Sequence, residues 1–366
     1  MRQPMPTDNP DHIPTPNEQT AVNEIVADFM DQGARATARL TERLFRHGPK
    51  IVSARRVRMS GFEERLSHRW GEALDLYELC LYLAQSCGEH FNKKFSTSST
   101  NCKFEALTRL HSGACRVAGE ILTLLSAGYA SGAHARWRTL HEISVIALFI
   151  SQEGDEVAER YRNHKFVKSY EDAIDYRKFA PRLNHEPISD KEFGEIEADF
   201  KRMIDRYGGS FRGPFGWARA AIANRNSGFK GRIGIEHIQD AIQVEHWRPY
   251  YRMASHAVHP SATFLRFNLG TRSDSRILLA GPSNSGLSDP GQGALMSLGH
   301  ATGALLTYDN SEGNEETSEF ARRASQRMEL IVMAFSLSEV IQAACETFVK
   351  IEKELEQEII EENQVT

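Results

Sequence analysis

Residues 104–127, FEALTRLHSGACRVAGEILTLLSA, and residues 133–152, AHARWRTLHEISVIALFISQ, are the most apolar part of the chain. In both stretches apolar residues recur at steps of three and four, which is the period of an amphipathic α-helix. The segment from Gly128 to Gly132 that joins them is short and has glycine at both ends. We therefore predict two neighbouring helices at the centre of the hydrophobic core.

The helical period continues on both sides of this pair. Residues 25–46 predict an amphipathic helix that ends at His47-Gly48-Pro49, because proline lacks the N–H that would continue it. Residues 208–235 are rich in Gly, Arg and Asn and predict a long irregular loop. Further helices are expected over residues 61–95, 155–179, 189–207, 236–246, 249–259, 292–308 and 315–362.

The pattern changes once, after His259. Residues 264–269 and 276–280 flank a turn-rich stretch and predict a small β-hairpin. The fold class is therefore mostly all-α, a multi-helix bundle with a small β-hairpin insertion near 264–280. The expected parts are a disordered Pro-rich tail (1–17), a helical arm (18–60), a core helical domain (61–310), and a long C-terminal helix (311–366) that packs on the core or on a partner chain.

Composition places the chain among globular proteins, with 40% hydrophobic and 25% charged residues and a net charge of −5. The five cysteines are odd in number and form no CxxC pair, so neither a disulfide framework nor a Cys-based zinc site is expected. The N-terminus lacks the apolar core of a secretory signal, and no apolar run approaches the roughly 20 residues of a membrane span. We expect a cytoplasmic protein without membrane contact.

Charge is unevenly distributed along the chain. Residues 35–69 contain ten Lys or Arg and three Asp or Glu, whereas residues 351–366 contain six Glu and one Lys. The basic segment is either a phosphate-attracting surface or, more simply, a solvated helix face. On the second interpretation it docks on the acidic C-terminal helix of the same or another chain, which makes a homodimer one expectation.

A first polar constellation lies in residues 135–142. On a helix Arg138 faces both Glu142 and His134, each four residues away. A charged pair on so apolar a helix is either exposed or paired and satisfied inside the protein. It therefore predicts either a structural ion pair that fixes helix packing or a polar binding pocket.

A second constellation, residues 247–260, combines arginine, tyrosine and histidine near one break in the chain. Arginine can clamp a phosphate, tyrosine can stack on a base, and histidine exchanges protons near neutral pH. The alternative is a Tyr/His hydrogen-bonding cluster in the core. The candidate residues are Arg248, Tyr251, Arg252, His256 and His259.

Three segments carry a family resemblance: Ala135–Glu142, Tyr161-Arg-Asn-His164 and Tyr251–His259. Together they resemble the bacterial family called domain of unknown function 5677, over roughly residues 70–310. The resemblance implies a helical scaffold without a settled activity.

A second resemblance is to HEPN-type ribonuclease domains, which are helical and usually dimeric. Their motif is an Arg followed after four to six residues by a His, a spacing that Arg252 and His259 meet. The resemblance implies that His259 acts as general acid or base toward an RNA 2′-hydroxyl, that Arg252 stabilises the developing charge, and that no metal is needed. Met253 stands where that family usually has a polar residue. The same spacing also joins Arg136 to His141 and Arg232 to His237.

The sequence shows no HExxH, Walker or GxGxxG motif in a suitable context, so no metal or cofactor is expected. The main hypothesis is a helical effector that binds a ligand or partner, RNA or a nucleotide among them, through a polar Arg/His/Glu pocket. The alternative is a HEPN-like, metal-independent endoribonuclease that acts in defence or growth arrest. The proposed binding residues are Arg138, Glu142, Tyr251 and Arg248, and the proposed catalytic residues are Arg252, His259 and His256.

Overall fold

The computed structural model describes residues 16–95, 101–226, 229, 231–259, 269–270, 279–308 and 317–365. The chain divides into two compact units, Met1–Glu64 and Arg65–Thr366. All regular elements in the described ranges are helices: α1 (Pro16–Phe95), α2 (Cys102–Ser126), α3 (Ala130–Gln152), α4 (Asp155–Asn163), α5 (Lys165–Phe179), α6 (Asp190–Tyr207), α7 (Arg219–Arg225), α8 (Ile235–Ala241), α9 (Arg248–Val258), α10 (Ser288–Leu306) and α11 (Thr317–Val365). Short 3-10 turns complete them: η1 (Ala180–Leu183), η2 (Gly209–Arg212), η3 (Gly216–Ala218) and η4 (Glu245–Trp247).

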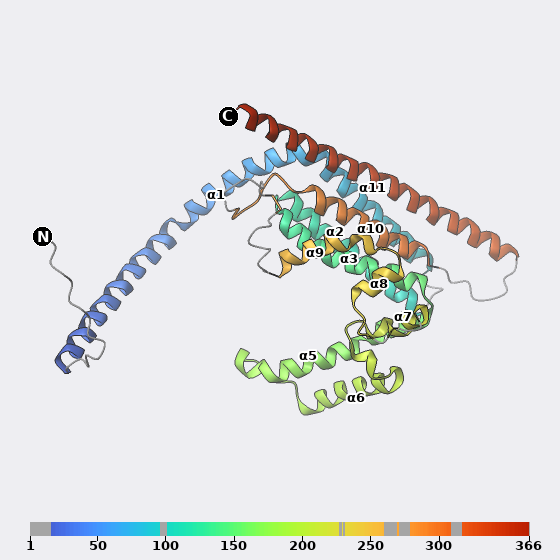
Figure 1. Cartoon of the computed structure of the whole chain (residues 1–366), viewed down its shortest axis with the longest axis horizontal. Helices are drawn as coiled ribbons and strands as arrows, with labels where there is room; N and C mark the ends of the chain where they lie inside the picture. The colour runs from blue at the N-terminus through green and yellow to red at the C-terminus, as the bar shows by residue number, and fades with distance from the viewer. Residues whose placement is uncertain are drawn as a thin grey trace. The chain divides into compact units, whose positions relative to one another are not determined.

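The core of the second unit is built on the two helices that the sequence placed at its centre. The helices α2 and α3 pack on each other, α10 packs on both, α11 packs on α10, and α9 packs on α3 (Figure 1). The C-terminal half of α1 joins this core, where the Tyr77 hydroxyl donates to the carbonyl of Ala118 (3.0 Å) and Trp70 lies 5.8 Å from the ring of Phe348. The multi-helix architecture expected from the sequence is confirmed.

Glycines let α10 lie close to its neighbours. A Cβ atom added at Gly291 would lie 2.7 Å from the ring of Phe348 in α11, and one at Gly293 would lie 3.0 Å from the ring of Trp137 in α3. Atoms this close would force a shift of the neighbouring ring or helix. The sequence of α10 therefore sets how closely α3 and α11 approach.

The ends of the helices show where the neighbouring residues in the sequence are enough to predict the structure. The Ser189 hydroxyl accepts from the N–H of Glu192 (3.2 Å) and caps the start of α6, where the sequence predicted a helix over residues 189–207. The expected helix over 155–179 is instead two helices, α4 and α5, that meet at His164. There the imidazole Nε2 lies 3.1 Å from the carbonyl of Phe211 and 2.9 Å from that of Gly213. Tertiary hydrogen bonds thus accompany a break that the local sequence did not predict.

The expected helix end at His47-Gly48-Pro49 is wrong. The helix α1 continues for 80 residues, with Pro49 in its interior. Proline removes one intrahelical hydrogen bond and costs about 3 kcal/mol, but the carbonyl that loses its partner can bond to water on an exposed helix. Here that carbonyl belongs to Phe45, which lies in the exposed stretch 41–47, and the good helix formers on both sides continue the helix through the proline.

Three other expectations have different outcomes. Residues 208–235, expected to be irregular, contain η2, η3 and α7. Nearly all of the expected tail and most of the expected hairpin, residues 264–268 and 271–278, lie outside the described residues. The hairpin positions that are described, 269–270 and 279–280, contain no strand.

One helical stretch among the described residues, Met328–Glu361 of α11, is long and apolar enough to cross a membrane by length and composition alone. In its most apolar window 22% of the residues are buried. The core helix of a soluble protein meets the same criteria, so this stretch is weak evidence for a membrane segment.

Candidate functional site

The contact between α3 and α9 brings together three of the predicted binding residues. The Arg138 guanidinium donates to the Tyr251 hydroxyl (2.8 Å) and lies 3.2 Å from the Glu142 carboxylate. The Tyr251 hydroxyl donates in turn to Glu142 Oε1. Burial, followed by the adjacent Glu142, raises the pKa of Tyr251 to about 12, so the phenol stays protonated. The triad closes on itself and fastens α9 to α3.

A second polar chain, which contains Arg248, lies beside this triad, where the ring of His141 is 5.8 Å from that of Tyr251. The Gln239 amide nitrogen lies 3.0 Å from the imidazole Nε2 of His141, and the Gln239 oxygen accepts from Arg248 Nε (3.3 Å). Arg248 also pairs with Asp240 at 2.6 Å. His141 is buried, which lowers its pKa to about 4 and keeps it neutral. The predicted Arg248 therefore joins α8 to the start of α9.

The predicted catalytic residues do not join this network. The side chains of Arg252 and His259 are exposed, and neither side chain makes a hydrogen bond or ion pair with another residue that the structure describes. His256 lies on α9 and is half-buried. No contact in the described part of the chain unites these side chains around one reacting group, so the ribonuclease interpretation stays a prediction.

A small aromatic cavity lies beside the triad, between α3, the start of α9 and the first turns of α10. Its volume is about 110 Å³. The ring of Trp137 lies 6.2 Å from that of Trp247, and Trp247 lies 5.8 Å from Tyr250. Its lining residues are His134, Trp137, Trp247, Tyr250, Asp289, Gln292, Gly293 and Met296. We call this cavity the aromatic pocket.

His134 is the most informative side chain of the aromatic pocket. It is 98% buried and stacks on Trp137 with ring centres 5.3 Å apart, yet it makes no hydrogen bond with any described residue. Burial lowers its pKa to about 4, so the imidazole is neutral, with one donor and one acceptor nitrogen. Its ring lines the cavity, so an imidazole without a partner among the described residues is available there to water or to a ligand that offers a donor or an acceptor.

The polar groups at the other wall come from α10. Partial desolvation raises the pKa of the Asp289 carboxyl, which makes no hydrogen bond with another described residue. The Gln292 amide donates to the Ser288 hydroxyl (2.9 Å), which leaves its carbonyl oxygen without a partner among the described residues. The aromatic pocket thus has apolar faces and unpaired polar edges.

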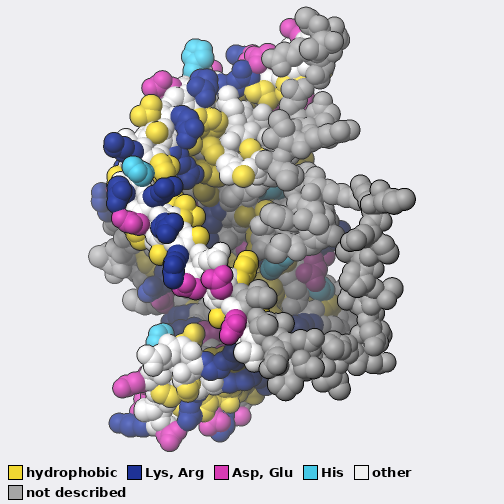
Figure 2. Space-filling model, turned by 90° about the vertical axis from the view of Figure 1, so that its left-hand side faces the viewer, with side chains coloured by type: hydrophobic (Ala, Val, Ile, Leu, Met, Phe, Trp, Pro, Cys, Tyr) yellow, Lys and Arg dark blue, Asp and Glu magenta, His cyan; other side chains and the backbone are white. Residues whose placement is uncertain are grey.

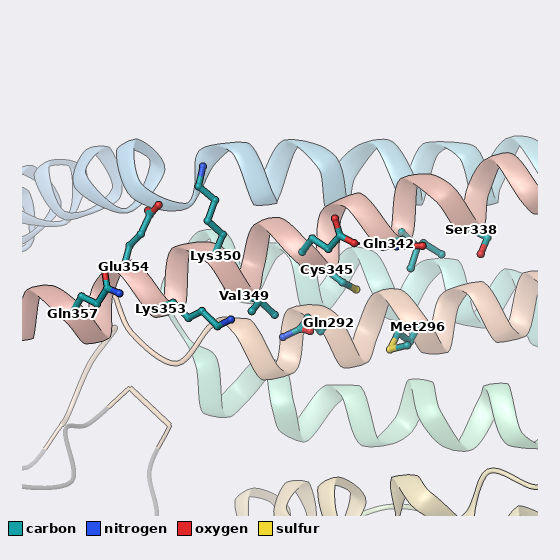
Figure 3. A pocket seen from close by; sticks show the side chains of 12 residues that line it. Gln292, Met296, Ser338, Gln342, Cys345, Val349, Lys350, Lys353, Glu354 and Gln357 are labelled. Carbon is teal, nitrogen blue, oxygen red and sulfur yellow. Dashed lines mark hydrogen bonds between the residues drawn. The ribbon is translucent and has the colours of Figure 1, made fainter.

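A larger groove of about 770 Å³ adjoins the aromatic pocket and shares Gln292 and Met296 with it. It lies between α10 and α11 and is open to solvent. Figure 3 shows Lys353 extending along the groove toward Gln292, whereas Lys350 points away from α10. Glu346 and Glu354 also line the groove, so its charges balance.

Sequence analysis found one wall of this site. His134 was noted for its position relative to Arg138, and Trp247 and Tyr250 lie in the second constellation. Trp137 lies in the first constellation but was not singled out, and the residues of α10 were missed because no motif links positions about 150 residues apart in sequence. In the described ranges no group of three or more His, Cys, Asp or Glu side chains is placed to hold a metal ion.

The fold and the cavity define a multi-helix protein with an aromatic pocket on the α3–α9–α10 contact. Residues 104–276 match the model of a protein family whose description is "Family of unknown function (DUF5677)". The match runs from α2 past α9 and supports the first of the two resemblances. Neither the curated proteins nor the solved structures contained a match.

Proposed function

We propose that the protein binds a small ligand that carries a flat heteroaromatic ring, such as a nucleobase, in the aromatic pocket. The observation that carries this proposal is the buried, unpaired imidazole of His134 in the wall of an aromatic cavity. A nucleobase supplies both a π-face for the tryptophans and edge groups that would satisfy His134, Asp289 and Gln292.

The size of the site supports this ligand class. A volume of about 110 Å³ is below the 300–1,000 Å³ of complete ligand sites and suits a single ring system. The adjoining groove provides space for the rest of the ligand. A ribose or phosphate leaving the aromatic pocket past Gln292 would enter the part of the groove toward which Lys353 extends (Figure 3).

The charges of the aromatic pocket and of the groove restrict the class of ligand further. Among the lining residues that the structure describes, Asp289 alone has a formal charge at neutral pH, since His134 is neutral. The pocket itself therefore favours an uncharged ring over an anionic one. The balanced charges of the groove favour a nucleoside or monophosphate over a polyphosphate.

The predicted binding residues have a positioning role in this proposal. Arg138 and Glu142 bind Tyr251, and Arg248 binds the end of α8, so both contacts hold the first turn of α9 against α3. Tyr250 belongs to that turn, and Trp247, the last residue of η4, directly precedes it. The polar network thereby fixes one wall of the aromatic pocket without touching the ligand.

The test is isothermal titration calorimetry of the full-length protein with the four nucleosides and their 5′-monophosphates, with choline as a non-planar cation. We expect at least one nucleoside to bind. His134→Phe keeps the ring stack but removes both nitrogens, and should weaken binding by about tenfold or more, as expected for an unreplaced buried hydrogen bond.

Two exposed tyrosines provide a second test and its matched control. Tyr250→Ala removes a wall of the aromatic pocket and should weaken binding about tenfold, the size of one lost stacking contact. Tyr82→Ala changes an exposed tyrosine of α1 that lines neither cavity, and should leave binding unchanged. Folded wild-type protein that binds no nucleoside or monophosphate, or binds choline alone, would contradict the proposal.

A further inference from the structure

The N-terminal half of α1, residues 20–62, exposes an apolar stripe that we call the arm stripe. Phe29 is 74% exposed, Leu40 is 59% exposed and Ile51 is 55% exposed. Val26, Met30 and Leu44 are also more than half exposed. Figure 2 shows hydrophobic side chains lying next to Lys and Arg on the exposed surface. Scattered exposed apolar residues are ordinary, but a continuous row along a helix is typical of an interaction surface.

The spacing of the arm stripe places its residues on one side of the helix. Phe29, Leu40, Ile51 and Phe62 follow one another at intervals of eleven, which is three helical turns with a drift of about 20°. One turn beyond Phe62 lies Leu66, the first of a row of buried residues in the same helix. The arm stripe is therefore the continuation of a face that α1 uses for packing further along.

The apolar area of the arm stripe is large enough for a stable pair. Six side chains that each expose roughly 100 Å² on each of two arms would bury about 1,200 Å² in total, the lower end of the range for specific interfaces. Helices in water also gain most of their stability from covering an apolar face. A second helix is the surface that fits a straight stripe of this length.

The charge pattern sets the direction of pairing. Residues 16–34 contain four Asp or Glu and no Lys or Arg, whereas residues 35–58 contain eight Lys or Arg and one Glu. Two parallel arms would place like charges side by side along their whole length. Two antiparallel arms place the acidic part of each against the basic part of the other.

Side-chain size sets the register. Gly33 and Gly48 have open space where a Cβ would be, and both lie along the arm stripe. In one antiparallel register Phe29 lies opposite Gly48, and Leu44 lies opposite Gly33. The same register places Val26 opposite Ile51. Large side chains then face small ones, as close packing of two helices requires.

We propose that the arm is a homodimerisation surface, in which two copies of this chain pair their arm stripes in antiparallel orientation. The acidic first part of the arm also argues against an anionic membrane or nucleic acid as the occupant, because three carboxylates would repel it over the first third of the stripe.

Sedimentation velocity of the full-length protein tests the surface. The wild type should be a dimer, and Leu40→Glu with Ile51→Glu should raise its dissociation constant at least about 100-fold, because four carboxylates would be buried per dimer. The matched control, Ala38→Glu with Ser53→Glu, adds the same charge on the opposite side of the helix and should leave the dimer intact. A monomeric wild type, or a dimer that survives the stripe variant, would overturn the proposal, as would a monomer that binds anionic vesicles or RNA through the arm.

Disulfide trapping tests the direction. Protein with Val26→Cys is mixed with protein with Ile51→Cys, and the mixture is oxidised. Mass spectrometry then identifies the linked residues. The wild type, which has five free thiols of its own, provides the background. Antiparallel pairing predicts a bond between residue 26 of one copy and residue 51 of the other, which forms only in the mixture. Crosslinks within each single-variant sample, joining equivalent residues, would show parallel arms and overturn the antiparallel assignment.

Discussion

The two halves of α1 carry the same kind of apolar stripe in different surroundings. In the C-terminal half Leu66, Trp70 and Tyr77 are almost completely buried. In the N-terminal half Phe29 and Leu40 are more than half exposed. Both halves are helical, so the amphipathic pattern is compatible with the helix in either setting. The difference shows that the pattern specifies a surface, whereas a neighbouring element decides whether that surface becomes core.

The largest expected effect is on the free energy of unfolding and comes from the buried half of α1. Trp70→Ala should lower the free energy of unfolding by about 3–5 kcal/mol, because it leaves a cavity beside Phe348 and removes the hydrogen bond to the carbonyl of Asn284. Phe29→Ala should change it by less than about 0.5 kcal/mol at protein concentrations where the chain is monomeric. Urea denaturation followed by circular dichroism measures both. Equal losses of unfolding free energy in the two variants would show that both halves of α1 are buried to the same extent.

The second prediction makes the same contrast within α10. Gly291→Ala should destabilise the fold by about 2–3 kcal/mol, since the added methyl would lie 2.7 Å from the ring of Phe348. Gly303→Ala, in the same helix with open space at that position, should be neutral or stabilise by up to about 1 kcal/mol. Thermal unfolding of both variants is the measurement. A harmless Gly291→Ala would mean that α10 and α11 can separate freely.

The third prediction concerns the buried histidines of the core. Burial lowers the pKa of His111, His134 and His141 to about 4, whereas the pKa of a solvated histidine is about 6.5. Between these values the unfolded chain binds protons that the folded chain does not, so stability falls as the pH drops from about 6.5 toward 4. Each histidine should account for about 2 kcal/mol at pH 5 and for nothing above pH 7.

Urea denaturation of the wild type and of His111→Gln at pH 7.5 and pH 5 measures this dependence. The variant should lose about 2 kcal/mol less than the wild type between the two pH values. An identical loss in both proteins would mean that the imidazole of His111 is protonated inside the fold.

The smallest expected effect concerns the contact between α3 and α9. Tyr251→Phe removes the hydroxyl that joins Arg138 to Glu142, and should lower stability by about 1–2 kcal/mol. Because the arginine and the glutamate keep their direct contact, neither charge is stranded. Nucleoside binding should weaken as well, since the first turn of α9 carries Tyr250 and directly follows Trp247. Unchanged binding would separate the triad from the aromatic pocket.

Part of the fold could be predicted because it depends on near neighbours in the sequence. The period of three and four residues locates α2, α3 and α6, and Ser189 marks a helix start through its hydroxyl. The pairing of Arg138 with Glu142 follows from their separation by one helical turn. In each case the interacting atoms are at most a few residues apart.

Other features could not be predicted because they depend on distant residues. The break at His164 is held by carbonyls of Phe211 and Gly213, almost 50 residues away. Proline ends many helices. Whether Pro49 ends its helix depends on whether water can reach the carbonyl that the proline leaves unpaired. Asp289 and Gln292 enter the aromatic pocket only because glycines let α10 approach α3.

The sequence by itself therefore determined where α2, α3 and α6 lie, the apolar faces and the charge pattern of the arm, since these follow from the chemistry and spacing of adjacent residues. Only the tertiary structure decided which apolar faces are covered, and that His134 lies unpaired in a cavity whose opposite wall comes from α10. The physical reason is that burial and hydrogen-bond satisfaction are properties of the complete packing arrangement, which joins residues about 150 positions apart.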